Sequence, residues 1–126
     1  MSKIVIYTSK LGGTKKVANY IASKIGAEAV QLNEDIDLSK YDKIILGSGV
    51  YAGKPSKAMM SFIEAHKEQL KDASLFVCCL YDGEKGAKQL ERISELTGIA
   101  DVIFFNKPKD QISVADSKLN EYIGTL

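Results

Sequence analysis

The sequence predicts an α/β fold in which a five-stranded parallel sheet has helices on both faces. Short apolar segments rich in β-branched residues alternate with segments of helical period along the chain. The apolarity of the short segments is continuous, which is typical of strands that are covered on both faces. Strands and helices that alternate at this spacing are joined by right-handed crossovers, and these connections make the strands parallel.

Five segments are predicted to be strands, and four of them share the continuous apolar character. The fifth is shorter and alternates more between apolar and polar residues, so we expect it at an edge of the sheet. In chain order the strands are Lys3 to Tyr7, Glu28 to Leu32 (the edge strand), Lys43 to Gly47, Ser74 to Leu80 and Asp101 to Phe105.

Three amphipathic helices are predicted, after the first, third and fourth strands. Each has apolar residues that recur at helical spacing on one face. Gly26 and Gly98 follow the first and third helices, where a left-handed residue favours termination. The apolar positions are Val17, Ala18, Ile21 and Ile25, then Met59, Phe62, Ile63, His66 and Leu70, then Ala87, Leu90, Ile93 and Leu96.

Two further segments depart from this alternation. Residues 33–42 are too few for a full helix and predict an extended loop with one turn, held by Ile36 and Leu38. Residues 116–123 have apolar positions at helical spacing and predict a short closing helix.

Length and composition limit the classes of function. A chain of 126 residues is expected to form one domain, here residues 1–126. The formal net charge of +1 gives no field for wrapping nucleic acid, and no apolar run approaches the ~18 residues of a membrane span. Adjacent cysteines on a strand, such as Cys78 and Cys79, are poorly placed for a disulfide. They indicate reduced thiols, so we expect a cytoplasmic protein. A monomer is expected as well.

Ligands of such parallel sheets bind beyond the carboxyl ends of the strands, at the point where the strand order reverses. Three loops reach that edge in the predicted fold, and we expect function to lie in them. They are Thr8 to Thr14, Ser48 to Ser56 and Tyr81 to Lys85.

The first loop, TSKLGGT, has the composition of a phosphate cradle. Its glycines let backbone N–H groups turn toward an anion, and Thr8, Ser9 and Thr14 offer hydroxyl donors. The N-terminus of the following helix adds a positive dipole end. A plain strand-to-helix turn with a threonine cap explains the loop alone equally well. The nucleoside-triphosphate P-loop is excluded, because Gly13 is followed by Thr14 and Lys15 in the wrong order.

The other reactive residue types have structural explanations. His66 falls at helical spacing with apolar residues, Met59 and Met60 fit as core filler, and Cys78 and Cys79 lie inside a strand. No Ser/His/Asp set, pair of carboxylates or metal-ligand spacing can be assembled. We therefore expect neither catalytic side chains nor a metal.

The segment YTSKLGGT resembles the phosphate loop of the flavodoxin family, commonly written S/T-x-T-G-x-T, and the order of the later elements fits that family. The resemblance covers essentially the whole chain. It implies a flavodoxin-like sheet of order 2-1-3-4-5 and FMN as cofactor. Ser9, Gly12 and Thr14 match the pattern. Leu11 replaces its central threonine, and Gly13 replaces its usual asparagine.

The resemblance also implies how the flavin ring is held. Tyr51 occupies the position of a ring-stacking side chain, and residues 52–53 take the place of a turn, favouring type II, beside flavin N5. Tyr81 is implied for the opposite wall. Thr8 and Lys10 are near enough to compensate for the donor missing at Leu11. The implied cofactor-binding residues are Thr8, Ser9, Lys10, Leu11, Gly12, Gly13, Thr14, Ser48, Gly49, Val50, Tyr51, Ala52, Gly53, Leu80, Tyr81, Asp82 and Gly83.

The function implied by the resemblance is that of an electron carrier, which exchanges electrons with redox partner proteins through FMN. Two alternatives stay open. The segment GSGVYAGKPSKAMMSFIEAHKEQL also resembles the flavodoxin-type bacterial protoporphyrinogen oxidases, which pass electrons from a porphyrinogen to a quinone. This chain lacks their long insertion after the fourth strand. The third possibility is a binding module that kept the fold and lost the flavin, for which Leu11 is the best support.

Overall fold

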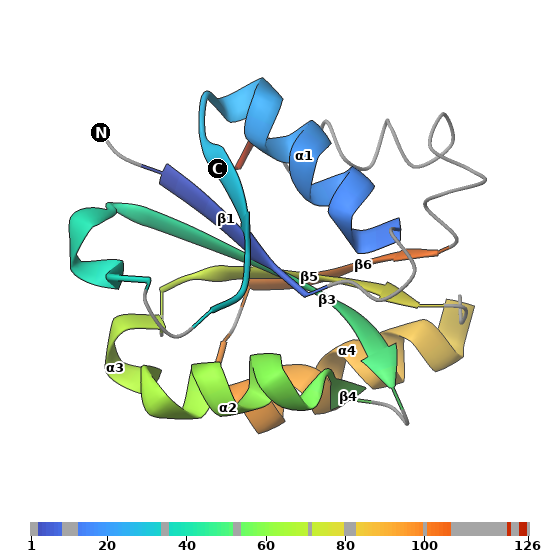
Figure 1. Ribbon diagram of the computed structural model, residues 1–126. Coiled ribbons are helices and arrows are strands. Elements are labelled where there is room, and N and C mark those ends of the chain that lie inside the picture. Colours follow the sequence, from blue (N-terminus) through green and yellow to red (C-terminus); the bar gives the residue numbers. More distant parts are fainter. Residues whose placement is uncertain are drawn as a thin grey trace.

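The computed structural model describes residues 3–8, 13–33, 36–51, 54–70, 72–79, 83–99, 101–106, 121 and 124–125. Strands and helices alternate along these residues (Figure 1). In chain order the elements are β1 (Lys3–Tyr7), α1 (Gly13–Ile25), β2 (Glu28–Gln31), the 3-10 helix η1 (Leu38–Lys40), β3 (Lys43–Tyr51), β4 (Lys54–Pro55), α2 (Lys57–Ala65), α3 (Lys67–Leu70), β5 (Ser74–Cys79), α4 (Gly83–Thr97) and β6 (Asp101–Asn106).

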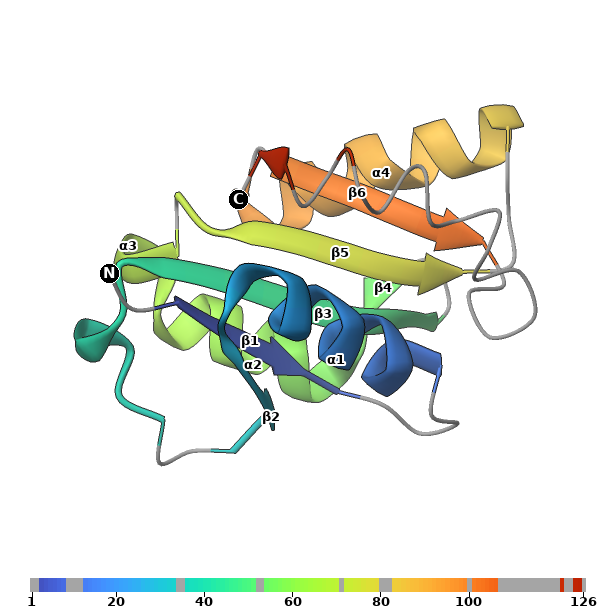
Figure 2. The same cartoon turned by 90° about the horizontal axis from the view of Figure 1, so that it is seen from above.

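Five parallel strands form the sheet in the order β2-β1-β3-β5-β6 (Figure 2). β4 adds a short antiparallel strand beside β3. When the parallel strands are numbered in chain order, this is the order 2-1-3-4-5 predicted from the resemblance. The strand order reverses between β1 and β3, and the predicted fold class is confirmed.

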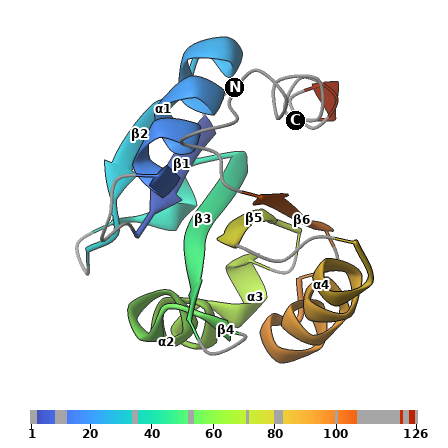
Figure 3. The same ribbon diagram turned by 90° about the vertical axis from the view of Figure 1, so that its right-hand side faces the viewer.

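Two hydrophobic clusters lie on the two faces of the sheet. Among the described helices, α1 covers one face, and α2, α3 and α4 cover the other (Figure 3). On the first face, Val17 and Ile21 of α1 pack with Val5 and Ile45 of the strands. The alternation of Val5 with its neighbours Ile4 and Ile6, which belong to the second cluster, explains why β1 is apolar throughout.

The ends of two helices agree with the glycine signals. Gly26 follows α1 with φ +69°, and Gly98 follows α4 with φ +74°. Both angles lie in the left-handed region, which glycine adopts without the steric cost of a side chain. The predicted helix terminations after residues 25 and 97 are therefore confirmed.

One predicted helix is divided into two. α2 ends at Ala65, and His66, with φ −122° and ψ 31°, separates it from α3. The His66 ring packs against Phe62 at 4.7 Å between centroids, and its Nδ1 lies 3.1 Å from Gln69 Oε1. These local contacts satisfy the imidazole at the break, and α3 directs Leu70 into the core with 1% exposure. His66 has a structural role, as predicted, but as a helix cap.

The predicted apolar face of α4 is wrong at its last position. Leu96 is 40% exposed, and Thr97 takes the buried position instead. The Thr97 hydroxyl donates to the Ile93 carbonyl at 2.8 Å and accepts from the Ile99 N–H at 3.2 Å. A threonine whose hydroxyl is bonded in this way can be buried at the end of a helix, one turn after Ile93. The side chains of Ala87 and Leu90, also predicted on this face, are not among those that the structure describes.

In the described part of the connection between β2 and β3, the 3-10 helix η1 forms the turn that was expected there. Leu38 is buried at the start of η1, and Ile36 packs against the same cluster. Asp37 caps η1, because its Oδ1 accepts from the Ser39 N–H at 3.1 Å and from the Ser39 hydroxyl at 2.7 Å. These two bonds hold the pKa of the exposed Asp37 carboxyl below its ordinary value. Of the predicted closing helix, Glu121 is described, and its backbone is helical.

A glycine in β3 is required by close packing. An added Cβ at Gly47 would lie 2.1 Å from Cζ of Phe76, its paired residue on β5. The Phe76 ring is fully buried in the cluster beneath α1. Gly47 therefore makes room for this ring at the centre of the sheet.

Candidate functional site

Several strands end and three helices begin at one edge of the sheet, on the right in Figure 1. α1 begins at Gly13 after β1, α2 at Lys57 after β4, and α4 at Gly83 after β5. The amino terminus of a helix presents free backbone N–H groups and a positive dipole end. This carboxyl-terminal edge, which contains the reversal of strand order between β1 and β3, therefore favours an anionic ligand.

Three hydroxyls form a cluster between the end of β1, the second half of β3 and the start of α2. Thr8 Oγ1 lies 2.9 Å from Ser56 Oγ and 3.3 Å from Ser48 Oγ. Ser48 Oγ also accepts from the Ser56 N–H at 3.0 Å and donates to the Gly49 carbonyl at 2.8 Å. Ser48 is 0% exposed and Thr8 is 9% exposed. This hydroxyl cluster of Thr8, Ser48 and Ser56 joins segments that lie far apart in the sequence.

Ser56 has a second role as the N-cap of α2. Its hydroxyl oxygen accepts a hydrogen bond from the Met59 N–H at 3.2 Å. Serine is favoured at this position because its oxygen satisfies a backbone donor that has no partner within the helix. Ser56 is absent from the site residues predicted above, although a serine directly before a helical apolar pattern is a recognisable cap signal.

Thr14 lies in the first turn of α1, at the same edge. It is 5% exposed, and its hydroxyl has no hydrogen-bond partner among the described residues. A buried hydroxyl without a partner carries a desolvation cost that a bound acceptor would remove. Together with the leading N–H groups of α1, this side chain fits a phosphate group.

The second predicted loop is a β-hairpin instead of an open loop. β3 continues to Tyr51, which pairs with Lys54, and Val50 pairs with Pro55. The segment GSGVY extends the strand because Ser48 and Gly49 still pair with β5. The predicted turn at residues 52–53 lies outside the described residues. The paired residues on either side of it, Tyr51 and Lys54, are described.

The third predicted loop, Tyr81 to Lys85, is shorter than expected, because α4 already begins at Gly83. Strand β5 ends at Cys79, so three residues, of which none is described, separate the strand from the helix. The first turn of α4 thus replaces the second half of this loop. A helix that starts here adds a further set of free N–H groups to the edge.

The predicted site residues fall into three groups. Thr8, Thr14, Ser48 and Gly49 are described and lie at the carboxyl-terminal edge, where Thr8 and Ser48 are in contact. For Gly13, Val50, Tyr51 and Gly83 the structure places the backbone at that edge. Those outside the described residues are Ser9, Lys10, Leu11, Gly12, Ala52, Gly53, Leu80, Tyr81 and Asp82.

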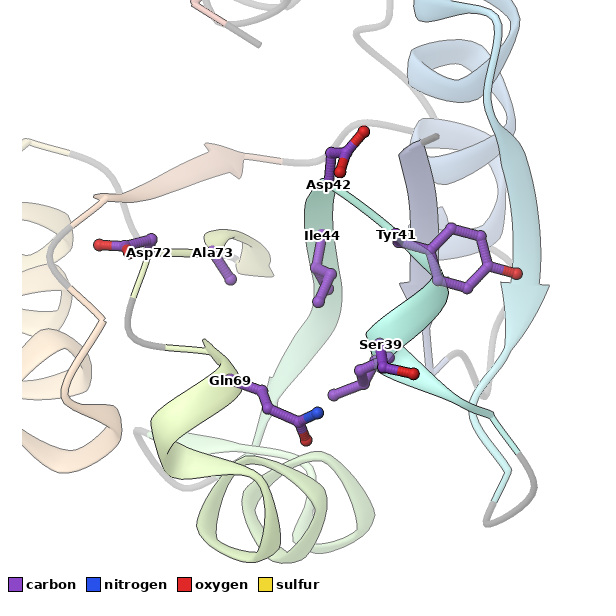
Figure 4. A pocket seen from close by; sticks show the side chains of 8 residues that line it. Ser39, Tyr41, Asp42, Ile44, Gln69, Asp72 and Ala73 are labelled. Carbon is purple, nitrogen blue, oxygen red and sulfur yellow. The ribbon is translucent and has the colours of Figure 1, made fainter. Parts of the chain in front are cut away.

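The opposite, amino-terminal edge of the sheet contains a cavity of about 260 Å³ (Figure 4). It lies between η1, the start of β3 and the segment from α3 to β5. Its lining includes the apolar side chains of Leu38 and Ile44 together with Asp42 and Asp72, which are exposed. This edge is far from the predicted loops and has acidic side chains.

Within the described part of the chain, no group of three or more His, Cys, Asp or Glu residues could hold a metal ion. None of the described helices is long and apolar enough to cross a membrane.

A parallel sheet with this strand order belongs to the doubly wound α/β class, in which ligands bind beyond the carboxyl ends of the strands. Comparison with models of known protein families identifies the family. The model of the flavodoxin domain matches residues 4–106. The chain therefore belongs to the flavodoxin domain family, as the phosphate-loop resemblance implied.

Solved structures share this fold at low sequence identity. A flavoprotein from Lactobacillus acidophilus, solved in complex with FMN, is 20% identical and has a TM-score of 0.67. The match covers 89% of this chain and 98% of that protein. A flavodoxin from the domain Archaea is 19% identical with a TM-score of 0.58, and the match covers 98% of this chain and 99% of that protein.

Curated sequences give a shorter match. The protoporphyrinogen IX dehydrogenase [quinone] of Escherichia coli strain K12 is 22% identical over 77 residues, which is 56% of this chain. The matched stretch spans 42% of that protein, which is less than half of its length. The likeness to these enzymes therefore concerns one part of their chain.

Proposed function

We propose that this protein binds FMN at the carboxyl-terminal edge of the sheet and carries electrons between redox partner proteins. The observation that carries the proposal is the buried hydroxyl of Thr14, without a partner among the described residues, in the first turn of α1. It lies beside the strand reversal in a chain of the flavodoxin domain family. The FMN complex of the Lactobacillus acidophilus relative supports the choice of cofactor.

The phosphate of FMN would be held by the loop between β1 and α1. In this proposal, the leading N–H groups of α1 and the Thr14 hydroxyl donate hydrogen bonds to the phosphate, without any ionised side chain. The other residues assigned to this loop are Ser9, Lys10, Leu11, Gly12 and Gly13.

The flavin ring would lie against the β3–β4 hairpin and the loop after β5. The hairpin brings the backbone of Tyr51 to this edge, and an aromatic side chain there would supply a flat apolar surface at small entropic cost. The remaining residues assigned to the ring site are Ser48, Gly49, Val50, Ala52, Gly53, Leu80, Tyr81, Asp82 and Gly83.

Bound FMN would supply the redox chemistry, since it accepts and returns electrons. The protein contributes binding, orientation and the exclusion of water from part of the ring. The adjacent cysteines favour a reducing compartment, so we place this carrier in the cytoplasm. We also propose that it is a monomer with a single domain over residues 1–126.

An enzymatic role is the second candidate, and it is favoured by the match to the protoporphyrinogen IX dehydrogenases of Escherichia coli. In that case FMN bound at the same edge would accept electrons from a porphyrinogen and deliver them to a quinone. Anaerobic mixing of the flavin-loaded protein with a porphyrinogen and a soluble quinone discriminates the two candidates. Turnover supports the enzyme, and its absence supports the carrier.

Titration with FMN and with riboflavin tests the proposed function. The purified chain is expected to quench FMN fluorescence on binding and to bind riboflavin more weakly, because riboflavin lacks the phosphate. Equal affinities for the two flavins would contradict the assignment of the phosphate to the first loop. A protein that binds neither flavin would instead be the colourless binding module.

A further inference from the structure

The hydroxyl cluster of Thr8, Ser48 and Ser56 has one consistent arrangement of its protons. A hydroxyl donates a single proton and accepts through its lone pairs. Ser48 donates to the Gly49 carbonyl at 2.8 Å, so the 3.3 Å bond between Thr8 and Ser48 uses the proton of Thr8. The 2.9 Å bond between Thr8 and Ser56 then uses the proton of Ser56. The donors therefore run in one direction, from Ser56 through Thr8 and Ser48 to the carbonyl of Gly49.

This arrangement leaves Thr8 without a proton for a ligand. An ionised phosphate accepts hydrogen bonds and needs donors around it. Thr8 could become such a donor only if its bond to Ser48 broke, and Ser48 is fully buried, so the loss would not be replaced by water. Thr14 differs from Thr8, because its hydroxyl has no partner among the described residues.

The cluster also connects the two segments that are proposed to hold the flavin. Thr8 is the first residue after β1, next to the proposed phosphate loop. Ser48 and Ser56 lie on the two arms of the segment that contains the β3–β4 hairpin, and the 3.0 Å bond from the Ser56 N–H to the Ser48 hydroxyl joins them. Without Thr8, the side-chain bonds of this cluster would no longer reach β1.

We infer that Thr8 is a positioning residue, which fixes the β3–β4 hairpin and the start of α2 against the end of β1 and does not donate to the phosphate. The inference rests on the proposed FMN site for its ligand. Since Thr8 acts through Ser48 and Ser56, it holds in place the segment that is proposed to contact the flavin ring, which FMN and riboflavin share. Its removal should affect every flavin to the same extent, with or without a phosphate.

The test compares Thr8→Val, which keeps the shape of the side chain, with Ser56→Ala, the double variant and the conservative Thr8→Ser. Dissociation constants for FMN and riboflavin are measured by fluorescence titration, and the melting temperatures of the flavin-free proteins are measured as well. Thr8→Val is expected to weaken the binding of both flavins by the same factor, about tenfold for one hydrogen bond. The double variant is expected to be no more than about twofold weaker than Ser56→Ala, because the two residues share one network. Thr8→Ser is expected to retain both affinities.

A tenfold loss for FMN with unchanged riboflavin binding would overturn the inference, because it would make Thr8 a phosphate donor. The inference would also be overturned if the fold-changes of Thr8→Val and Ser56→Ala in the dissociation constants multiplied in the double variant. Unchanged affinities in Thr8→Val would overturn it as well. If the wild-type chain binds neither flavin, the proposed function fails, and the melting temperatures still decide about the cluster. The cluster is supported if each single substitution lowers the melting temperature and the double variant melts no lower than the less stable single variant. Additive effects on the melting temperature, or no effects, contradict it.

Discussion

The two edges of the sheet carry polar groups of opposite character. At the carboxyl-terminal edge, Thr8, Thr14 and Ser48 are buried and uncharged, and helices begin beside them. At the amino-terminal edge, the exposed carboxylates of Asp42 and Asp72 line a cavity of about 260 Å³. Helix amino termini attract an anion, whereas carboxylates repel it. Among the described side chains, the carboxyl-terminal edge therefore fits the proposed phosphate site better than the amino-terminal edge does.

The largest expected effect breaks the packing behind the carboxyl-terminal edge. Gly47→Ala places a methyl group 2.1 Å from the buried ring of Phe76, so the strand or the ring must move. We expect a loss of about 3 kcal/mol in the free energy of unfolding, at the upper end of the range for overpacked cores. Urea denaturation measures it. Gly124→Ala is the control, since an added Cβ there meets nothing within 4 Å, and a comparable loss in that variant would refute the explanation.

The next effect concerns the phosphate. Thr14→Val removes a neutral donor to a charged acceptor, which is worth about 1.5–3 kcal/mol, or roughly ten- to hundredfold in affinity for FMN. Fluorescence titration is the measurement. Thr14→Ser keeps the hydroxyl and should bind as the wild type does, and riboflavin binding should be the same in all three proteins. Asp72→Asn, at the opposite edge, should leave FMN binding unchanged. If Asp72→Asn weakened FMN binding as much as Thr14→Val does, the assignment of the phosphate to the carboxyl-terminal edge would be wrong.

A smaller effect is expected from the aromatic ring proposed to face the flavin. Tyr51→Ala removes the stacking, worth about 0.5–1.5 kcal/mol, together with the apolar contact area of the ring, so binding weakens by at least roughly two- to tenfold. The bound flavin should also become more fluorescent. Tyr51→Phe retains a ring and should retain the quenching. Unchanged quenching in the alanine variant would place the flavin elsewhere.

The smallest effect lies next to the amino-terminal edge. Because the two bonds from Ser39 hold the pKa of Asp37 below its ordinary value, the ionised carboxylate stabilises the folded state. This contribution is fully present above the unfolded-state pKa of about 4 and is lost as the pH falls through the lower, folded-state pKa. Asp37→Asn should therefore be slightly less stable than the wild type at pH 7 and equally stable at pH 2, as measured by urea denaturation. Ser39→Ala should raise the pKa of Asp37, and a difference between wild type and Asp37→Asn that persists at pH 2 would contradict the cap.

Most of the fold could be predicted because local patterns determine it. The apolar run of β1 gave its bounds, and the two glycines after α1 and α4 adopt the left-handed conformation expected of them. The hairpin could not be predicted in the same way, since Gly47 and Gly49 lower the strand propensity of its first arm. That arm is stabilised by pairing with β5, whose partners lie far along the chain.

The position of the loops at one edge of the sheet was predictable, but the hydrogen bonds between their residues were not. The loops after β1 and β3 could be located from the strand pattern, and Thr8, Thr14 and Ser48 lie there. The bonds from Thr8 to Ser48 and Ser56 connect residues 40 and 48 positions apart. No local sequence signal reports such contacts, because they depend on how β1, β3 and α2 are packed together. The burial of Thr97 instead of Leu96 on α4 has a different origin, since the Thr97 hydroxyl is satisfied by the Ile93 carbonyl of its own helix.

The shortness of β2 has a consequence for self-association. β2 forms one edge of the described sheet, and such an edge offers unpaired backbone groups to any passing strand. Here the edge is four residues long, and its first and last side chains, Glu28 and Gln31, are exposed. A foreign strand could form few backbone bonds with it and would meet the carboxylate of Glu28 as it approached. The β2 edge is therefore a poor template for the growth of fibres.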